Sequence, residues 1–158
     1  LTENIRSFLS VVQPSIFAHH IHIIEDYNDN IFIKSYPNDL IQSFINIFNN
    51  AKDALKNLPE EERYFFITSE ITEDKIVITL KDNAGGIEKN ILDKVFEPYT
   101  TTKHKSQGTG LGLNITYNFI VTGMQGEITV QNTDFTHNNK VYKGAEFKIY
   151  FPLETDSQ

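Results

Sequence analysis

The fold is decided by two glycine-rich stretches, Asp82-Asn83-Ala84-Gly85-Gly86 and Gly108-Thr109-Gly110-Leu111-Gly112-Leu113. Together they hold most of the eight glycines in the chain. Glycine loses more conformational freedom on folding than any other residue, so a cluster of glycines indicates that the backbone approaches something closely. The usual partner is a phosphate group or a flat ring. Both stretches follow a segment with asparagines at positions 46 and 50, and this order points to a nucleotide site.

Length and composition limit the class of protein. A chain of 158 residues, 39% of them hydrophobic, is expected to form a single domain over residues 1–158 with its own core. Its formal net charge of −7 argues against duplex nucleic acid as a partner, because phosphate neutralisation requires a basic surface. The chain has no cysteine, which excludes a disulfide framework and a thiolate metal site. No membrane span or signal peptide is visible, so we expect an intracellular, soluble protein.

Hydrophobic periodicity and turn residues predict a mixture of helices and strands. Helices are expected over residues 2–18, from about 37 or 38 to 57, over 88–95 and over 111–123. Thr2 is expected to cap the first helix, and Pro14 to interrupt it or to end its first segment. Strands are expected over residues 20–26, 31–36, 63–72, 75–81, 126–132 and 141–151. Helices mixed with antiparallel hairpins predict an α+β fold, a two-layer α/β sandwich whose mixed, mostly antiparallel sheet carries helices on one face.

A polar stripe follows one side of the helix predicted after residue 37. At about 100° per residue, Asn46, Asn50, Asp53 and Asn57 fall within roughly a 60° arc, opposite an apolar stripe. Such a stripe often simply faces water. Asparagine is a mediocre helix former, however, and a solvated face more often carries Glu and Lys. Since Mg²⁺ prefers hard oxygen donors such as amide oxygens, the stripe suggests a Mg²⁺ site without establishing it.

The first glycine stretch begins where a predicted strand ends. The apolar residues 76–80 run into Asp82, and Gly85 and Gly86 can take the positive φ angles that a tight turn needs. An ordinary loop would explain this segment equally well. In the functional interpretation, Asp82 is a buried acceptor for an exocyclic amine and Gly86 leaves room for a ring. A ligand without the amine would then be rejected, because the carboxylate would be left unpaired.

A basic loop precedes the second glycine stretch. Lys103, His104 and Lys105 stand out in an acidic protein, although charged loops are usually just solvated. Beside a phosphate site, such a loop can close over a polyphosphate and neutralise it. The second stretch leads into a predicted helix, whose N-terminal N–H groups attract phosphate. Its spacing fits neither the Walker A pattern nor the dinucleotide fingerprint, so it would be a third way of binding phosphate.

Together these pieces resemble the ATP-binding catalytic domain of sensor histidine kinases, within the GHKL or Bergerat-fold ATPase superfamily. Residues 46–51 resemble the N box, 82–87 the first glycine box, 96–98 the F box and 108–113 the second glycine box. Residues 144–147 are similar to the closing strand motif. The match covers essentially the whole chain. It implies the Bergerat fold, bound Mg²⁺–ATP and a place in a two-component phosphorelay.

The resemblance implies roles for residues around the phosphates. Asn50 would be the Mg²⁺ ligand, and Asn46 would contribute to the phosphate or metal shell. Lys103 would approach the β- or γ-phosphate from the lid, so Asn46 and Lys103 would be the residues acting in catalysis. Asp53 would belong to the nucleotide-binding set with them.

Other roles concern adenine and the lid. Asp82 would accept a hydrogen bond from the adenine amine, and the turn Ala84-Gly85-Gly86 would place Gly86 against the ring. The glycines of the second box would give the lid its hinge and let the backbone wrap the phosphates, namely Gly108, Gly110 and Gly112.

Departures from the family pattern bear on the activity. Hydrolytic relatives carry a glutamate, the general base for water, where this chain has Asn46, so we expect ATP to be held but hydrolysed poorly. Many members carry a threonine in the closing strand, where this chain has Ala145 and Glu146, and that adenine contact is therefore in doubt. None of the five histidines is followed by Glu or Asp, the pattern of the phosphoacceptor, so that histidine is expected on another domain.

The resemblance therefore predicts a protein-histidine kinase catalytic domain. It would bind Mg²⁺–ATP and donate the γ-phosphoryl group to a histidine of the parent kinase's dimerisation domain, with a response regulator downstream. It would act in the cytoplasm without direct contact to nucleic acid or membrane, although the parent could be membrane-anchored. Two alternatives remain: a serine kinase or anti-sigma factor of the same superfamily, and a nucleotide-sensing module without catalysis.

Overall fold

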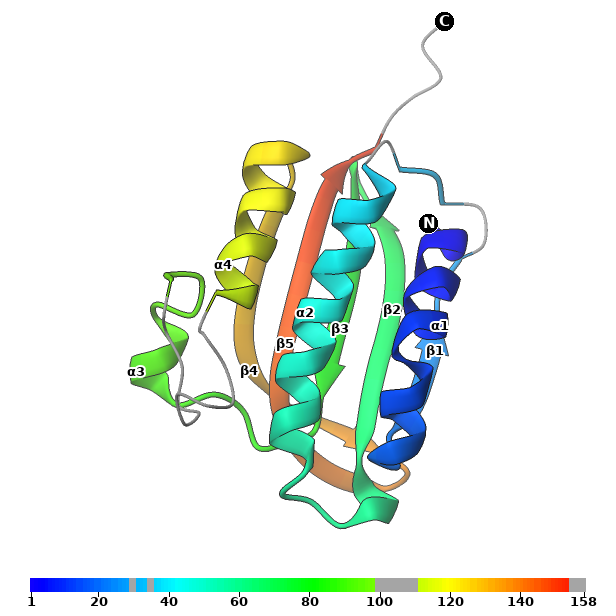
Figure 1. Cartoon of the computed structure of the whole chain (residues 1–158), viewed down its shortest axis with the longest axis vertical. Helices are drawn as coiled ribbons and strands as arrows, with labels where there is room; N and C mark the ends of the chain where they lie inside the picture. Colours follow the sequence, from blue (N-terminus) through cyan, green and yellow to red (C-terminus); the bar gives the residue numbers. More distant parts are fainter. Residues whose placement is uncertain (29–30, 34–35, 99–110, 154–158) are drawn as a thin grey trace, which may run out of the picture.

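A five-stranded sheet with helices on one face forms the computed structural model, which describes residues 1–28, 31–33, 36–98 and 111–153 (Figure 1). The strands lie in the order β1-β2-β3-β5-β4. Strand β1 pairs with β2 in parallel, and the other three pairs are antiparallel. The bounds are His22–Asp26 for β1, Tyr64–Thr72 for β2, Lys75–Asp82 for β3, Glu127–His137 for β4 and Lys140–Pro152 for β5. This arrangement confirms the predicted α+β class.

Three helices cover one face of the sheet, with α2 between α1 and α4 (Figure 1). Their bounds are Thr2–Ala18 for α1, Pro37–Leu55 for α2 and Gly112–Tyr117 for α4, which continues as a π-helical segment, η2, over Asn118–Gly123. A 3₁₀ turn, η1, spans Glu60–Glu62. The helix predicted over residues 88–95 is shorter than expected and spans Lys89–Leu92 as α3. Proline at the first position of α2 is favourable, because that N–H has no partner within a helix.

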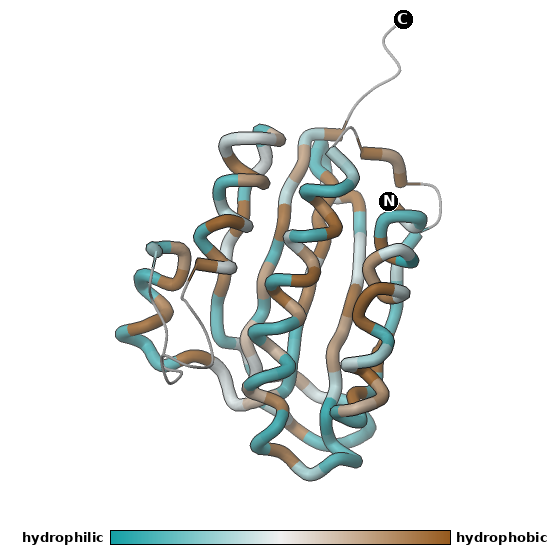
Figure 2. The backbone as a smooth tube through the Cα atoms, in the orientation of Figure 1, coloured by the Kyte–Doolittle hydropathy of each residue, from teal (hydrophilic) through white to brown (hydrophobic). Residues whose placement is uncertain are grey.

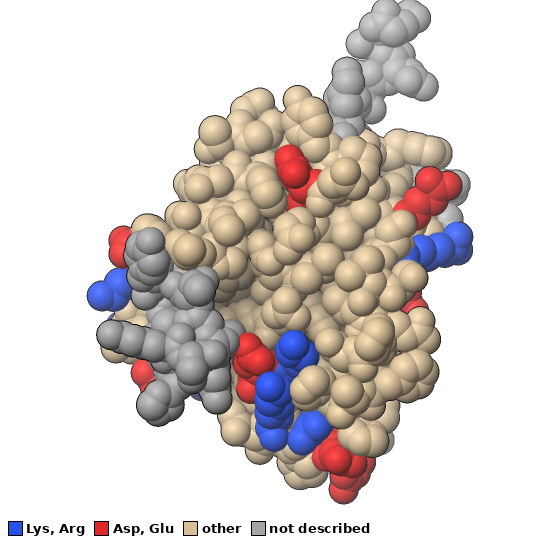
Figure 3. Space-filling model, in the orientation of Figure 1, with Lys and Arg blue, Asp and Glu red and all other residues tan. Residues whose placement is uncertain are grey.

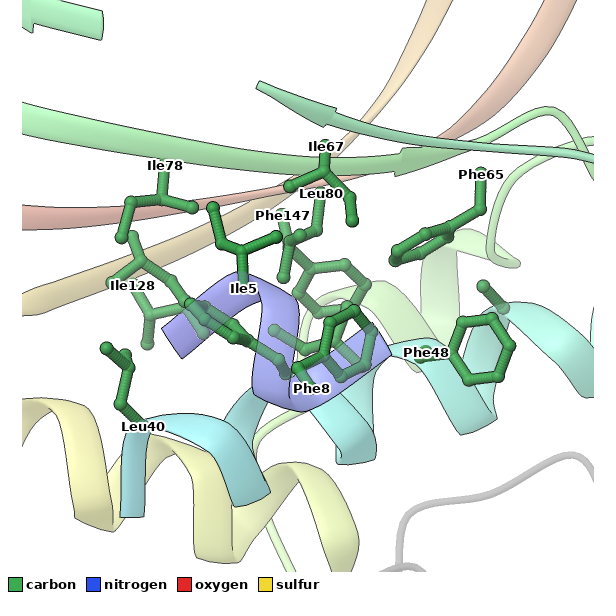
Figure 4. Close-up of a cluster of buried hydrophobic side chains, with 14 of the residues drawn as sticks. Ile5, Phe8, Leu40, Phe48, Phe65, Ile67, Ile78, Leu80, Ile128 and Phe147 are labelled. Carbon is green, nitrogen blue, oxygen red and sulfur yellow. The ribbon is translucent and has the colours of Figure 1, made fainter. Parts of the chain in front are cut away.

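The core lies between the helices and the sheet. Apolar residues recur along the helices and strands in Figure 2, and aromatic rings from three elements meet where they converge. The ring of Phe8 lies 5.7 Å from that of Phe44 and 5.9 Å from that of Phe48, and Phe48 in turn packs edge-to-face on Phe65 at 5.3 Å. Figure 4 shows Phe8, Phe48 and Phe65 in this cluster. Such edge-to-face pairs add to the stabilisation from burial itself and fix α1 and α2 against β2.

Helix α1 differs from its prediction at both marked residues. It runs through Pro14 to Ala18, so the prediction that Pro14 interrupts or ends it is wrong. Its N-cap position is Leu1, and no side chain caps it, so Thr2 is the first helical residue. Tertiary packing accounts for the difference, because Ile5, Phe8 and Val12 bury one face and outweigh the hydrogen bond that proline removes.

The strand predicted over residues 31–36 is also wrong for the part that the structure describes. Residues 31–33 and 36 have no regular secondary structure. Ile31 is nonetheless buried, and its carbonyl accepts a hydrogen bond from the amino group of Leu1 at 3.2 Å. The alternating isoleucines therefore reflect packing beside α1 rather than a strand.

The last hairpin is longer than predicted, since β4 reaches His137 and β5 begins at Lys140. The prediction ended the first strand of this hairpin at residue 132, where apolar alternation stops. Pairing continues because the extension packs on β2: the Phe135 ring lies 5.3 Å from Phe66 and the His137 ring 4.7 Å from Tyr64. These long-range contacts carry no local sequence signal.

Candidate functional site

Asp82 ends β3 as a buried carboxylate, with 4% of its surface exposed. Its Oδ1 atom accepts hydrogen bonds from the backbone N–H groups of Ala84, at 2.9 Å, and Ala145, at 3.2 Å. Burial raises the pKa of Asp82 from 3.8 to about 6, and these two hydrogen bonds act in the opposite direction. At neutral pH the carboxylate is therefore mostly ionised, although it lies in a poorly solvated place.

The second carboxylate oxygen of Asp82 is available to a ligand. It has no hydrogen-bond partner among the described residues. Within the same part of the chain, no buried side-chain oxygen or nitrogen lacks a partner. Oδ2 must therefore keep some contact with the surface. A carboxylate with one oxygen fixed by the backbone and the other open is suited to accept a hydrogen bond from a bound amine.

The turn after Asp82 has the predicted geometry. Gly85 and Gly86 adopt φ angles of +96° and +89°, which L-amino acids with side chains rarely adopt. The N–H of Gly85 donates to the carbonyl of Lys143 at 2.8 Å. The side chain of Asn83 is also fixed, because it accepts from the N–H of Tyr64 and donates to the carbonyl of Glu62. The turn is thus held by β5 and by the start of β2.

A neighbouring side chain explains why residue 86 is a glycine. A Cβ atom built there would lie 2.7 Å from Oδ1 of Asn132, which belongs to β4. The space beside this glycine is filled by that amide group. This contact is independent of whether a ring also approaches Gly86, so the ring contact stays a prediction.

Asn46 joins α2 to α4. Its Nδ2 group donates to the carbonyl of Gly112 and to the hydroxyl of Thr116, both at 3.0 Å, and its Oδ1 accepts from Gln42 at 2.9 Å. Both polar atoms of this amide are therefore engaged. The arrangement places Asn46 beside the segment that follows the second glycine box, and a metal contact would require Oδ1 to leave Gln42.

Asn50 and Asp53 extend the same side of α2, and both are half-buried. Asn50 has no hydrogen-bond partner in the described part of the chain, whereas Asp53 forms an ion pair with Lys56 at 3.5 Å. Within the described residues, no group of three His, Cys, Asp or Glu side chains could hold a metal ion by itself. An available amide oxygen fits Mg²⁺ that arrives with phosphates and waters as its other ligands.

Part of the predicted phosphate site lies outside the described residues. This concerns Lys103, Gly108 and Gly110. Gly112 is described and begins α4, where a Cβ atom would meet Asn46 at 3.8 Å, an ordinary contact distance.

On the helical face of the molecule few side chains are charged, and a group of positively and negatively charged side chains gathers at the lower end of this face (Figure 3).

Sequence reasoning did not assign several residues that build the site. Gly144 of β5 passes so close to Asp82 that a Cβ atom there would lie 1.7 Å from the Asp82 carbonyl oxygen. Ala145 contributes through its N–H rather than through its side chain. Thr116 and Asn132 act through hydrogen bonds to partners far away in the sequence, whereas Gln42 bonds to Asn46 one turn along the same helix. The glycine in the closing strand motif was the one available signal.

Comparison with known sequences matches most of the chain to one family. Residues 35–155 match the family described as "Histidine kinase-, DNA gyrase B-, and HSP90-like ATPase". Sporulation kinase A of Bacillus subtilis (strain 168) is 38% identical over 124 residues, which cover 78% of this chain and 18% of that kinase. The chain spans about a fifth of the length of sporulation kinases A and E of that organism.

Solved structures share the fold. The nucleotide-free catalytic domain of histidine kinase ThkA superposes with a TM-score of 0.77 and 26% identity, covering 97% of this chain and 92% of that domain. A structure of ThkA in complex with response regulator protein TrrA superposes with a TM-score of 0.71 and 22% identity, covering all of this chain and 42% of that one. None of the helices that the structure describes is long and apolar enough to cross a membrane.

Proposed function

Because this chain belongs to the histidine kinase-, DNA gyrase B- and HSP90-like ATPase family, as a histidine kinase catalytic domain, we propose that it binds Mg²⁺–ATP and donates the γ-phosphoryl group to a histidine on a separate dimerisation domain. The observation that carries the proposal is the carboxylate of Asp82, buried beside a glycine turn with one oxygen open.

Asp82 would recognise adenine. Its Oδ1 is held by two backbone N–H groups, so the carboxylate cannot rotate freely, and Oδ2 would accept a hydrogen bond from the exocyclic amine. A ligand that presents a carbonyl at this place would bring an oxygen against a buried carboxylate. Such a mismatch is costly, because the charged group has little water to compensate it.

The polar side of α2 would face the phosphates. The amide oxygen of Asn50 would be a protein ligand of Mg²⁺, which neutralises phosphate charge during phosphoryl transfer. Asp53 would belong to the same surroundings, and Lys103 would approach the β- or γ-phosphate. Asn46 would hold α4 in place through its Nδ2 group. Its Oδ1 would reach the phosphate or metal shell by giving up the hydrogen bond that it accepts from Gln42.

Transfer would be favoured over hydrolysis by the residue one turn before Asn50. That residue is Asn46, a neutral amide that cannot take a proton from an attacking water. Transfer would instead depend on positioning: a nitrogen of the acceptor histidine forms a bond to the γ-phosphorus as the bond to the leaving ADP breaks. The dimerisation domain of the parent kinase would supply the histidine.

The named relatives favour this function over a serine kinase or an anti-sigma factor. Sporulation kinase A and ThkA are both named as kinases, and ThkA is a histidine kinase seen with a response regulator. A response regulator would accordingly accept the phosphoryl group downstream. The domain would work in the cytoplasm, whether or not its parent is anchored in a membrane.

Phosphoryl transfer to a supplied histidine tests the proposal. The chain is incubated with Mg²⁺ and ATP labelled at the γ-phosphate, together with the dimerisation domain of its parent kinase. We expect the label to appear on that domain, to be acid-labile, and to be absent when the acceptor histidine is changed to glutamine. Label that is acid-stable on serine would contradict the proposal, as would release of free phosphate without transfer.

A further inference from the structure

We infer that Asn132 is a positioning residue of the nucleotide site, acting through the backbone of Ile87. Its Oδ1 accepts a hydrogen bond from the Ile87 N–H and its Nδ2 donates to the Ile87 carbonyl, both at 2.8 Å. The side chain thus pairs with a single residue of the turn as a neighbouring strand would. The inference rests on the proposed function, because it concerns the site in which Asp82 would recognise adenine.

The register of the last hairpin explains why this contact matters. Asn132 of β4 lies opposite Ala145 of β5. The N–H of Ala145 binds the carboxylate of Asp82, where the turn starts, while the side chain of Asn132 binds Ile87, where the turn ends. One rung of the hairpin therefore holds both ends of the segment 82–87.

A second observation shows that the turn is shaped around this amide. The position of a Cβ atom on Gly86 would lie 2.7 Å from Oδ1 of Asn132 and 2.9 Å from its Cγ. Gly86 also has a φ angle of +89°, so the missing side chain serves both the backbone conformation and the close approach of Asn132. Without the amide, the fixed point at Ile87 would be lost, and the turn beyond Gly85, whose N–H stays bonded to Lys143, would be free to move relative to Asp82.

Asn132 is exposed, so its removal leaves the core intact and allows a clean test. The matched control is Thr129→Ala, an exposed residue of the same strand whose side chain has no hydrogen bond to the described residues. Binding of ADP to the parent, Asn132→Ala and Thr129→Ala is measured by calorimetry, with and without Mg²⁺, well below the melting temperature. We expect Asn132→Ala to weaken ADP binding about tenfold, since two hydrogen bonds to one backbone unit are lost. The loss of ADP affinity should be equally large with and without Mg²⁺, because the turn is proposed to contact the base and not the phosphates.

A purely structural role would have a different result. It would lower the melting temperature of Asn132→Ala while leaving its ADP affinity equal to that of Thr129→Ala, and this would overturn the inference. Amide hydrogen exchange gives an independent check, because exchange at Ile87 should become faster in Asn132→Ala alone. Faster exchange with unchanged ADP affinity would also overturn it. Failure of the parent to bind ADP would instead contradict the proposed function, which keeps the two failures distinct.

Discussion

Asp82 is a residue whose proposed function costs stability. Burial of its carboxylate raises the pKa to about 6 in the folded protein, against 3.8 for an ordinary aspartate. The folded state therefore binds the proton more tightly than the unfolded state. Proton binding by Asp82 therefore favours folding below pH 3.8, and this stabilisation is lost as the pH rises through about 6. At neutral pH the ionised, buried carboxylate destabilises the fold by up to about 3 kcal/mol.

Replacement of Asp82 by asparagine should consequently stabilise the protein in a pH-dependent way. The amide oxygen can still accept from the N–H groups of Ala84 and Ala145, while the buried charge is removed. We expect a gain of up to about 3 kcal/mol in the free energy of unfolding at pH 7.5 that shrinks towards zero near pH 4. Urea unfolding at both pH values measures it, with Asp134→Asn, an exposed aspartate, as control. A gain of equal size at pH 4 would refute the assignment.

Gly144 and Gly112 provide a matched pair of glycine substitutions. A Cβ atom at Gly144 would overlap the Asp82 carbonyl oxygen at 1.7 Å, whereas at Gly112 it would make an ordinary contact with Asn46 at 3.8 Å. We expect Gly144→Ala to lose about 3 kcal/mol of stability and Gly112→Ala to be neutral or stabilising, because alanine is the better helix former. Thermal unfolding of both variants compares them. Equal melting temperatures would show that the hairpin lies farther from β3 than described.

At the residue scale, the sequence identified Asp82, Asn46 and Asn50 as side chains of interest. Their surroundings could not be derived, because the partners come from distant positions. Asn46 illustrates this: its position on the polar side of α2 was predictable, but its bonds to Gly112 and Thr116 join residues 66 and 70 positions away. No local pattern indicates such a pairing.

At the element scale, the join between α2 and α4 depends on one amide. Helix α4 has six residues before the π-helical segment begins, so it is too short to be stable by itself. Asn46 ties its first turn to α2 through the carbonyl of Gly112, which also accepts from the Thr116 hydroxyl at 2.9 Å. The position of the segment after the second glycine box is therefore set by α2.

Two asparagine substitutions in α2 test this link. Asn46→Ala removes the bonds to Gly112, Thr116 and Gln42, while Asn49→Ala removes a half-buried side chain that has no hydrogen bond among the described residues. Both changes gain the same helix propensity, so their difference isolates the hydrogen bonds. We expect Asn46→Ala to be less stable by about 1–3 kcal/mol in urea unfolding. If the two variants unfold at the same urea concentration, the link does not stabilise α4.

Strong periodic signals predicted most elements, and the errors have physical causes. Helix α2 and strands β2 and β3 follow their predicted ranges within two residues, since each combines clear periodicity with a defined start or stop. Residues 31–33 alternate like a strand but pack beside α1. The end of β4 is polar in sequence and is held by Phe66 and Tyr64 of β2, so only the folded structure reveals it.

At the scale of the whole molecule, the last hairpin connects the sheet to the proposed site. Its middle contributes the N–H of Ala145 and the side chain of Asn132 to the segment 82–87. Its far end packs on Tyr64 and Phe66, and Lys140 forms an ion pair with Glu62. Helix α2 supplies the other side of the site through Asn46 and Asn50. The proposed nucleotide would therefore lie where the helical layer and the β4–β5 hairpin both contribute side chains.

The most direct test of this account compares the binding of ATP and GTP to the chain by calorimetry. If Asp82 accepts a hydrogen bond from the adenine amine, ATP should bind and GTP should bind at least about tenfold more weakly, because its ring presents a carbonyl to a buried carboxylate. Asp82→Asn should weaken ATP binding by about 1–3 kcal/mol and remove the preference. Equal affinity of the parent chain for ATP and GTP would contradict the account.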